Sequence, residues 1–211
     1  MIPKGDPGLV FVVDDDAGVR RMISRMLRSV GLRAKTYASV QEFLDLYDRN
    51  QTGCLVLDVR MPGLSGLELQ EHLAAIEAPL PIIFITGHGD IAMGVRAMKR
   101  GAADFIEKPF QDQVLLDAIH AALSRAVELR SVAAARNDAR KRLATLTPRE
   151  REVLALVVAG RLNKQIAVQL GTAEQTIKMH RGRLMRKMDA DSLPALVRLA
   201  QLAGVADEPP V

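Results

Sequence analysis

The chain has 211 residues, of which 48% are hydrophobic and 26% are charged, and its formal net charge is +4. This composition is typical of globular proteins, and the length accommodates two modest domains. No apolar run approaches the roughly 20 residues of a membrane span, and the N-terminus lacks the pattern of a secretory signal. The single cysteine, Cys54, excludes an intrachain disulfide, so we expect a cytoplasmic protein without a membrane partner.

Charge is distributed unevenly along the chain. Residues 1–124 carry 13 basic and 16 acidic side chains, residues 125–144 carry 6 and 2, and residues 145–205 carry 10 and 5. The acidic N-terminal half is typical of a domain that binds a cation, and the basic C-terminal half is typical of one that binds a polyanion. A solvated basic surface without a ligand is the alternative for the back half.

Short apolar segments alternate with helical patterns in the first 124 residues. This alternation predicts an α/β domain in which a five-stranded, parallel, doubly wound sheet is covered by helices. In chain order we expect a strand at Leu9–Val13, a helix at Ala17–Val30, a strand at Arg33–Tyr37, a helix capped by Ser39 that runs through Asp48, a strand at Cys54–Leu57, a helix at Gly66–Ile76, a strand at Pro81–Thr86, a helix at Ile91–Arg100, a strand at Ala103–Ile106 and a long helix from Asp112.

Polar residues stand at the ends of four predicted strands: Asp14, Asp58, Thr86 and Lys108. Because ligands bind outside the carboxyl ends of parallel strands, we expect these four side chains to converge. Together with Asp15 they would place three carboxylates in one pocket, which favours a bound Mg²⁺ and an aspartate that accepts a phosphoryl group. A purely structural acid cluster is the alternative.

Several motifs in this half carry a family resemblance. Asp14-Asp15, Asp58-Val59-Arg60-Met61-Pro62-Gly63, Thr86-Gly87 and Lys108-Pro109-Phe110 resemble the signature of two-component receiver domains. The resemblance implies that a sensor histidine kinase phosphorylates Asp58. It also implies that Mg²⁺, with Mn²⁺ as an alternative, is held by Asp14, Asp15, Asp58 and the Arg60 carbonyl.

The same resemblance assigns roles to other residues of the pocket. Thr86 and Lys108 would bind the phosphoryl oxygens, and the Lys108–Pro109 bond would be cis. Phe105 would be the switch aromatic that fills the space left when Thr86 moves. Arg60 and His88 would flank the pocket, where they could tune the lifetime of the phosphoryl group; an ordinary loop side chain is the alternative for each.

The back half reads as helical throughout. No Gly or Pro occurs from Asp112 to Ala144, which predicts a long helix that begins as receiver core and continues as a linker, with a coiled coil as the alternative. Four further helices are expected: one capped by Thr147 with Pro148 in its first position and ended by Gly160, one capped by Asn163 that runs through Leu170, one capped by Thr172 that runs to about Met188, and one at Leu193–Ala203. A disordered tail is expected at Asp207–Val211.

This half also resembles a known family. Leu146–Leu154, Asn163–Ala167 and Thr176–Arg181 resemble the LuxR-type helix-turn-helix domain, and the whole chain resembles response regulators of the FixJ/NarL type. The resemblance implies that Lys178 and Met179 face base edges and that the last helix dimerises, although its apolar stripe would equally suit closure of the domain core. The side chains that would hold phosphates are Lys164, Arg181, Arg183 and Lys187.

We therefore expect a receiver domain at 1–124, a helical linker at 125–144 and a LuxR-type DNA-binding domain at 145–211. The expected function is a transcriptional response regulator that phosphorylation of Asp58 switches to a homodimer on promoter DNA, with RNA polymerase as a further partner. An aspartate-nucleophile phosphatase is an alternative, which Arg60 disfavours because such enzymes place an acid there. A DNA-binding protein whose receiver serves only protein contacts is another.

Overall fold

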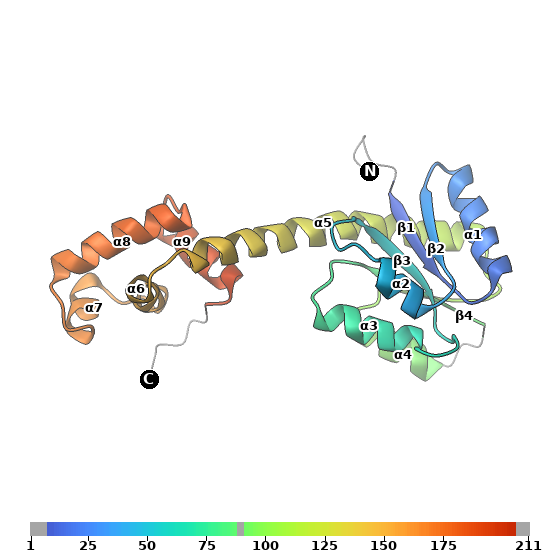
Figure 1. The fold of residues 1–211 in the computed structure, drawn as a ribbon, viewed down its shortest axis with the longest axis horizontal. Coiled ribbons are helices and arrows are strands. Elements are labelled where there is room, and N and C mark those ends of the chain that lie inside the picture. Colours follow the sequence, from blue (N-terminus) through green and yellow to red (C-terminus); the bar gives the residue numbers. More distant parts are fainter. Residues whose placement is uncertain (1–7, 88–90, 206–211) are drawn as a thin grey trace. The chain divides into compact units, whose positions relative to one another are not determined.

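The computed structural model describes residues 8–87 and 91–205 (Figure 1). His88 and the expected tail at Asp207–Val211 lie outside these ranges. The chain divides into two compact units, residues 1–131 and 132–211, and each has a hydrophobic core. Within the described ranges, none of the helices combines the length and the apolar character needed to cross a membrane.

The first unit is built on a five-stranded parallel sheet, as predicted. Its strands lie in the order β2-β1-β3-β4-β5. The strand bounds are β1 Leu9–Val13, β2 Arg33–Tyr37, β3 Gly53–Asp58, β4 Ile82–Thr86 and β5 Asp104–Glu107. The three central strands are buried on both faces, which explains why they read as continuous apolar runs rather than as alternating patterns.

Helices cover both faces of this sheet (Figure 1). Side chains that alternate along β1 belong to two separate cores: Phe11 packs with residues of α2, α3 and α4, whereas Val10 and Val12 pack with residues of α1 and α5. The helix bounds are α1 Ala17–Ser29, α2 Val40–Leu46, α3 Gly66–Ala75, α4 Ile91–Lys99 and α5 Asp112–Ala144. The doubly wound architecture predicted from the sequence is therefore confirmed.

Most bounds in this unit lie within one residue of the prediction, but the end of α2 differs by two. The helix expected to run through Asp48 ends at Leu46, because Tyr47 has an extended backbone with φ −74° and ψ 117°. The Tyr47 ring stacks on Phe43 at 5.0 Å between centroids and meets Phe11 edge-on at 5.6 Å. The helix thus ends where the chain turns an aromatic ring into the core, and such tertiary contacts override local helix propensity.

The second unit is all-helical. Its helices are α6 Pro148–Val158, α7 Asn163–Gln169, α8 Glu174–Met188 and α9 Leu193–Ala203, and the last turns of α5 belong to the same unit. Their apolar faces meet in one core, in which Val153, Ile166, Ile177, Leu184 and Leu196 are buried. Arg142 near the end of α5 donates to the Met188 carbonyl at 2.9 Å, so this end of α5 is anchored to α8.

Two predicted helix caps are wrong in this unit. Asn163 is the first residue of α7 rather than its cap, which is Leu162, and the Asn163 side-chain oxygen accepts a hydrogen bond from Arg181 at 2.8 Å. The cap of α8 is Ala173 rather than Thr172, and no side chain caps that helix. In α7 the contact with α8 replaces the local cap that the sequence favours.

The cap of α6 agrees with the prediction and has a further partner. Thr147 and Glu150 form a capping box. The carboxylate of Glu150, which is 3% exposed, also accepts from the Lys187 ammonium of α8 at 2.6 Å. The hydrogen bond from Lys187 and that from the Thr147 backbone hold the pKa of Glu150 at about 2, well below its ordinary value of 4.5. One carboxylate thus joins the start of α6 to the end of α8.

We predict that Glu150→Gln lowers the free energy of unfolding of the second unit by about 2 kcal/mol at pH 7, because it leaves a partly buried ammonium without its counter-charge. Since folding lowers the pKa of Glu150, the ionic contribution is complete above about pH 4.5 and is lost as the pH falls toward 2. Urea unfolding between these pH values measures the effect. Glu152→Gln is the matched control, because Glu152 pairs with Arg149 on the exposed side of α6; an equal loss in both variants would contradict the prediction.

Candidate functional site

The carboxyl edge of the sheet gathers polar side chains from four strands. Asp14 directly follows β1, Asp58 ends β3, Thr86 ends β4, and Lys108 directly follows β5. Asp14, Asp58 and Thr86 are buried, although all three are polar. The parallel register thus brings together residues that are far apart in the chain, as the strand-end pattern predicted.

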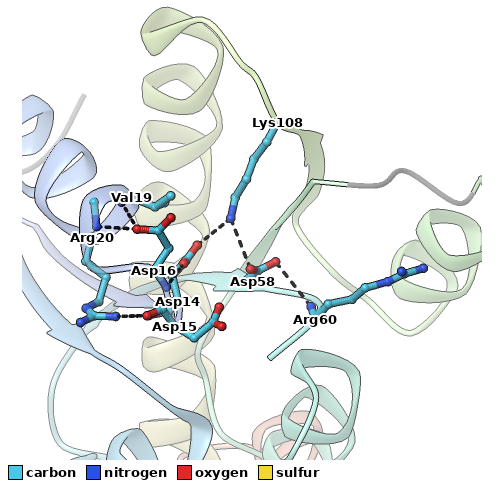
Figure 2. Close-up of polar contacts among 9 residues, drawn as sticks. Asp14, Asp15, Asp16, Val19, Arg20, Asp58, Arg60 and Lys108 are labelled. Atoms are coloured by element: carbon cyan, nitrogen blue, oxygen red, sulfur yellow. Dashed lines mark hydrogen bonds and ion pairs between the residues drawn. The ribbon is translucent and has the colours of Figure 1, made fainter. Parts of the chain in front are cut away.

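Three carboxylates form the centre of this edge (Figure 2). Oxygens of Asp14, Asp15 and Asp58 all lie within 4.8 Å of one another, and Asp15 is the exposed member. Both oxygens of Asp14 already accept hydrogen bonds, from the Asp16 backbone at 2.8 Å and from Lys108 at 2.7 Å. Such a set of oxygen donors is consistent with a site for a divalent cation.

Lys108 supplies positive charge to the same cluster (Figure 2). Its ammonium lies 2.7 Å from Asp14 and 3.3 Å from Asp58. Burial raises the pKa of Asp58, and the charge of Asp14 raises it further, although Lys108 acts in the opposite direction. Burial alone would lower the pKa of Lys108, but its hydrogen bond to Asp14 and the charges of both carboxylates raise it. The pocket therefore balances crowded negative charge against one cation.

Arg60 lies beside Asp58 through its backbone. Its N–H donates to an Asp58 oxygen at 3.4 Å, whereas Figure 2 shows its side chain extending away from the carboxylates. The backbone of Gly66 packs directly against that of Asp58. A side chain at this position would place its Cβ 2.3 Å from the Asp58 carbonyl oxygen, so only glycine fits. The chain after β3 is thus packed closely around the central aspartate.

Phe105 lies on β5, which is two strands away in the sheet from β3 and its Asp58. Its half-buried ring packs near Phe84, with 6.3 Å between centroids, and lies against Gly94 of α4. A Cβ on Gly94 would approach this ring to 3.2 Å, so the glycine makes room for it.

The backbone N–H of Lys108 donates to the Thr86 carbonyl at 2.7 Å, and the Lys108–Pro109 bond is cis, as the resemblance implied.

The sequence analysis missed Arg20, which contacts the acidic loop on the side away from Asp58 (Figure 2). Its guanidinium donates to the backbone carbonyls of Asp14 at 2.5 Å and Asp15 at 2.9 Å. Asp16 caps α1 by accepting from the Gly18 and Val19 amides. From sequence alone, an arginine within a helix is usually interpreted as a solvated side chain. Only the position of Arg20, about one turn after the acidic loop, could have indicated its contacts.

The side chains predicted to contact DNA occupy different environments in the second unit. Lys164, Lys178 and Arg183 are exposed, and Met179 is 46% exposed on α8. Lys178 lies 3.5 Å from Glu174 on its own helix. Arg181 is half-buried and donates to Asn163, while Lys187 binds Glu150 and the Thr145 carbonyl.

Comparison with known proteins identifies both halves. Residues 10–120 match the response regulator receiver domain, and residues 144–200 match the luxR family of bacterial regulatory proteins. The chain is 49% identical to nodulation protein W of Bradyrhizobium diazoefficiens over 94% of this chain and 87% of that protein. It is 48% identical to the transcriptional regulatory protein FixJ of Azorhizobium caulinodans over 93% of each chain.

Solved structures of similar proteins cover most of the chain. The response regulator StyR is 48% identical with a TM-score of 0.72, covering 93% of this chain and 99% of its own. Full-length FixJ from B. japonicum is 41% identical with a TM-score of 0.56, covering 96% and 100%. The chain belongs to the FixJ-type response regulators, which are transcription factors with an acidic receiver domain and a LuxR-type DNA-binding domain rather than turnover enzymes.

Proposed function

We propose that Asp58 accepts a phosphoryl group from a sensor histidine kinase and that the added charge shifts the chain toward a homodimer that binds promoter DNA. The observation that carries this proposal is the meeting of Asp14, Asp15, Asp58 and Lys108 at one edge of the sheet. A buried carboxylate of this kind can attack a phosphoryl group. The neighbouring ammonium, together with a cation bound by the acids, would offset the negative charge of the phosphoryl oxygens.

The donor set suits Mg²⁺, with Mn²⁺ as an alternative ion. Asp14, Asp15, Asp58 and the Arg60 carbonyl would hold it, with the exposed Asp15 best placed to bind directly because Asp14 has donors on both oxygens. When bound, the ion supplies positive charge that offsets the repulsion between the carboxylates and the phosphoryl oxygens.

The transfer itself uses the carboxylate of Asp58. One of its oxygens forms the new O–P bond while the P–N bond to the kinase histidine breaks, and the electron pair of that bond stays on the imidazole nitrogen. Lys108, which lies 3.3 Å from Asp58, binds a phosphoryl oxygen, and the Thr86 hydroxyl donates to another. The elevated pKa of Asp58 means that burial holds its charged form in a less favourable environment before transfer.

A packing change then carries the signal away from Asp58. Movement of Thr86 toward the phosphoryl group opens space at the end of β4, and the Phe105 ring, which lies against Gly94, moves into it. The surface of α4, β5 and α5 changes with it and supports pairing of two chains. We assign these steps to a receiver domain at 1–124, joined by a linker at 125–144 to the DNA-binding domain at 145–211.

On the DNA side, α8 enters the major groove. Lys178 and Met179 face base edges, and the exposed Lys164 and Arg183 hold phosphates. Lys187 is paired with Glu150, which offsets part of its charge, whereas Arg181 donates to the neutral Asn163 amide and keeps its charge for the phosphates. The protein acts in the cytoplasm, where RNA polymerase is a further partner and the thiol of the buried Cys54 stays reduced.

Asp58→Asn tests the switch in the full chain. We expect acetyl phosphate with Mg²⁺ to convert the wild type to a dimer and to tighten DNA binding at least about tenfold, a coupling of roughly 1.4 kcal/mol, while the variant responds to neither. Light scattering and fluorescence anisotropy measure the two effects. Asp16→Asn is the matched control, because that carboxylate caps α1 and the new amide can still cap. If the wild type and Asp58→Asn behave alike, the receiver serves only protein contacts.

Metal binding has its own test. Mg²⁺ at ten times its dissociation constant should stabilise the wild-type receiver unit by about 1.4 kcal/mol, because the ion binds the folded site only. Asp15→Asn should lose most of this gain, since it removes the exposed carboxylate of the cluster. Thermal unfolding with MgCl₂ and with EDTA provides the measurement. An undiminished gain in Asp15→Asn would remove that residue from the site.

Salt dependence tests the DNA surface. Arg183→Ala should weaken binding to all sequences similarly and reduce the slope of log K against log salt by about 1. Lys178→Ala should instead alter the preference among operators. Arg198→Ala on α9 is the control, because it removes an exposed arginine from a different helix. Equal slopes for the wild type and Arg183→Ala would place this arginine away from the phosphates.

A further inference from the structure

The acidic loop after β1 is held by one side chain from the helix that follows it. The guanidinium of Arg20 donates from a single nitrogen to the carbonyls of Asp14 and Asp15, at 2.5 and 2.9 Å (Figure 2). These carbonyls belong to the two peptide units on either side of the Asp15 Cα. Because each peptide unit is planar, fixing both of them fixes the direction in which the Asp15 side chain leaves the backbone.

Asp15 depends on such support more than its neighbours do. Asp14 is buried and has donors on both of its side-chain oxygens, and Asp16 is fixed by its cap contacts with Gly18 and Val19. Asp15 is exposed, yet its carboxylate lies within 4.8 Å of those of Asp14 and Asp58. Its place in the cluster therefore rests on the backbone that Arg20 holds.

Arg20 also contributes charge at a useful point. The guanidinium of the half-buried Arg20 lies beside Asp14 and Asp15, on the side away from Asp58 and Lys108 (Figure 2), where its charge offsets part of the repulsion between the aspartates. It belongs to the first turns of α1, and its own backbone N–H donates to the Asp16 carbonyl at 3.1 Å. Helix and side chain thus approach the loop from the same side.

We propose that Arg20 is a positioning residue for the cation site: it presets the Asp14–Asp15 backbone so that Asp15 can bind a divalent ion and Asp58 can accept a phosphoryl group. This inference rests on the proposed function of the receiver. Arg20 touches neither reacting group, so it acts through the loop. Residues that orient metal ligands in this way typically change metal affinity by about 10-fold to 100-fold when they are removed.

The test compares Arg20→Met with Arg21→Met in the full chain. The two variants lose the same charge from adjacent positions on α1, but Arg21 is exposed and lies on another side of the helix. Mn²⁺ binding, followed by the loss of the free-ion electron paramagnetic resonance signal, should weaken about tenfold in Arg20→Met and remain unchanged in Arg21→Met. Phosphorylation by acetyl phosphate at limiting Mg²⁺ should slow in the same variant and recover at saturating Mg²⁺.

The outcomes separate this inference from the function on which it rests. If the wild type binds no Mn²⁺, the proposed function and this inference both fail. If the wild type binds Mn²⁺ and Arg20→Met binds it equally well, or if Arg21→Met weakens it as much, only the role of Arg20 is overturned. Should Arg20→Met not fold, Arg20→Gln, whose amide ends well short of the position of the guanidinium, gives the same comparison: weaker Mn²⁺ binding supports the role, and unchanged binding overturns it.

Discussion

The ammonium of Lys108 lies between the carboxylates of Asp14 and Asp58, which are 94 and 50 positions away in the chain. Buried carboxylates so close together repel each other and are costly to remove from water unless positive charge lies among them. The parallel sheet provides this arrangement, since it ends β1, β3 and β5 at one edge. The same crowding makes the pocket receptive to a cation, because a positive ion offsets the repulsion between the carboxylates.

Ion pairing serves a different purpose in the second unit. Glu150 and Lys187 join the start of α6 to the end of α8 through a contact in which the carboxylate is buried and the ammonium is partly exposed, and this contact lowers the pKa of Glu150. Basic residues on α8 therefore divide into two groups. Lys187 and Arg181 contact other parts of the domain, whereas Lys178 and Arg183 extend into solvent. The helix that we propose to bind DNA is thus also held by its own domain.

Local patterns predicted the elements well and some of their ends poorly. The Thr147 cap of α6 depends only on residues that are close in the chain, so it was predictable from the sequence and is confirmed. The ends that involve distant partners were not: Tyr47 leaves its helix to join an aromatic core, and Asn163 binds Arg181 instead of capping α7. Each error arises where a contact between elements outweighs a local preference of similar size.

The sequence by itself determined the alternation of strands and helices, the uneven charge, and the strand-end aspartates, because periodicity and parallel topology act through neighbouring residues and general rules. Tertiary structure decided which groups share a hydrogen bond. In the folded chain Lys108 lies between two carboxylates and Lys187 pairs with Glu150. Arg20 donates to the backbone carbonyls of Asp14 and Asp15. Long basic side chains can reach several ångströms in many directions, so their partners depend on the packing of whole elements rather than on their positions in the chain.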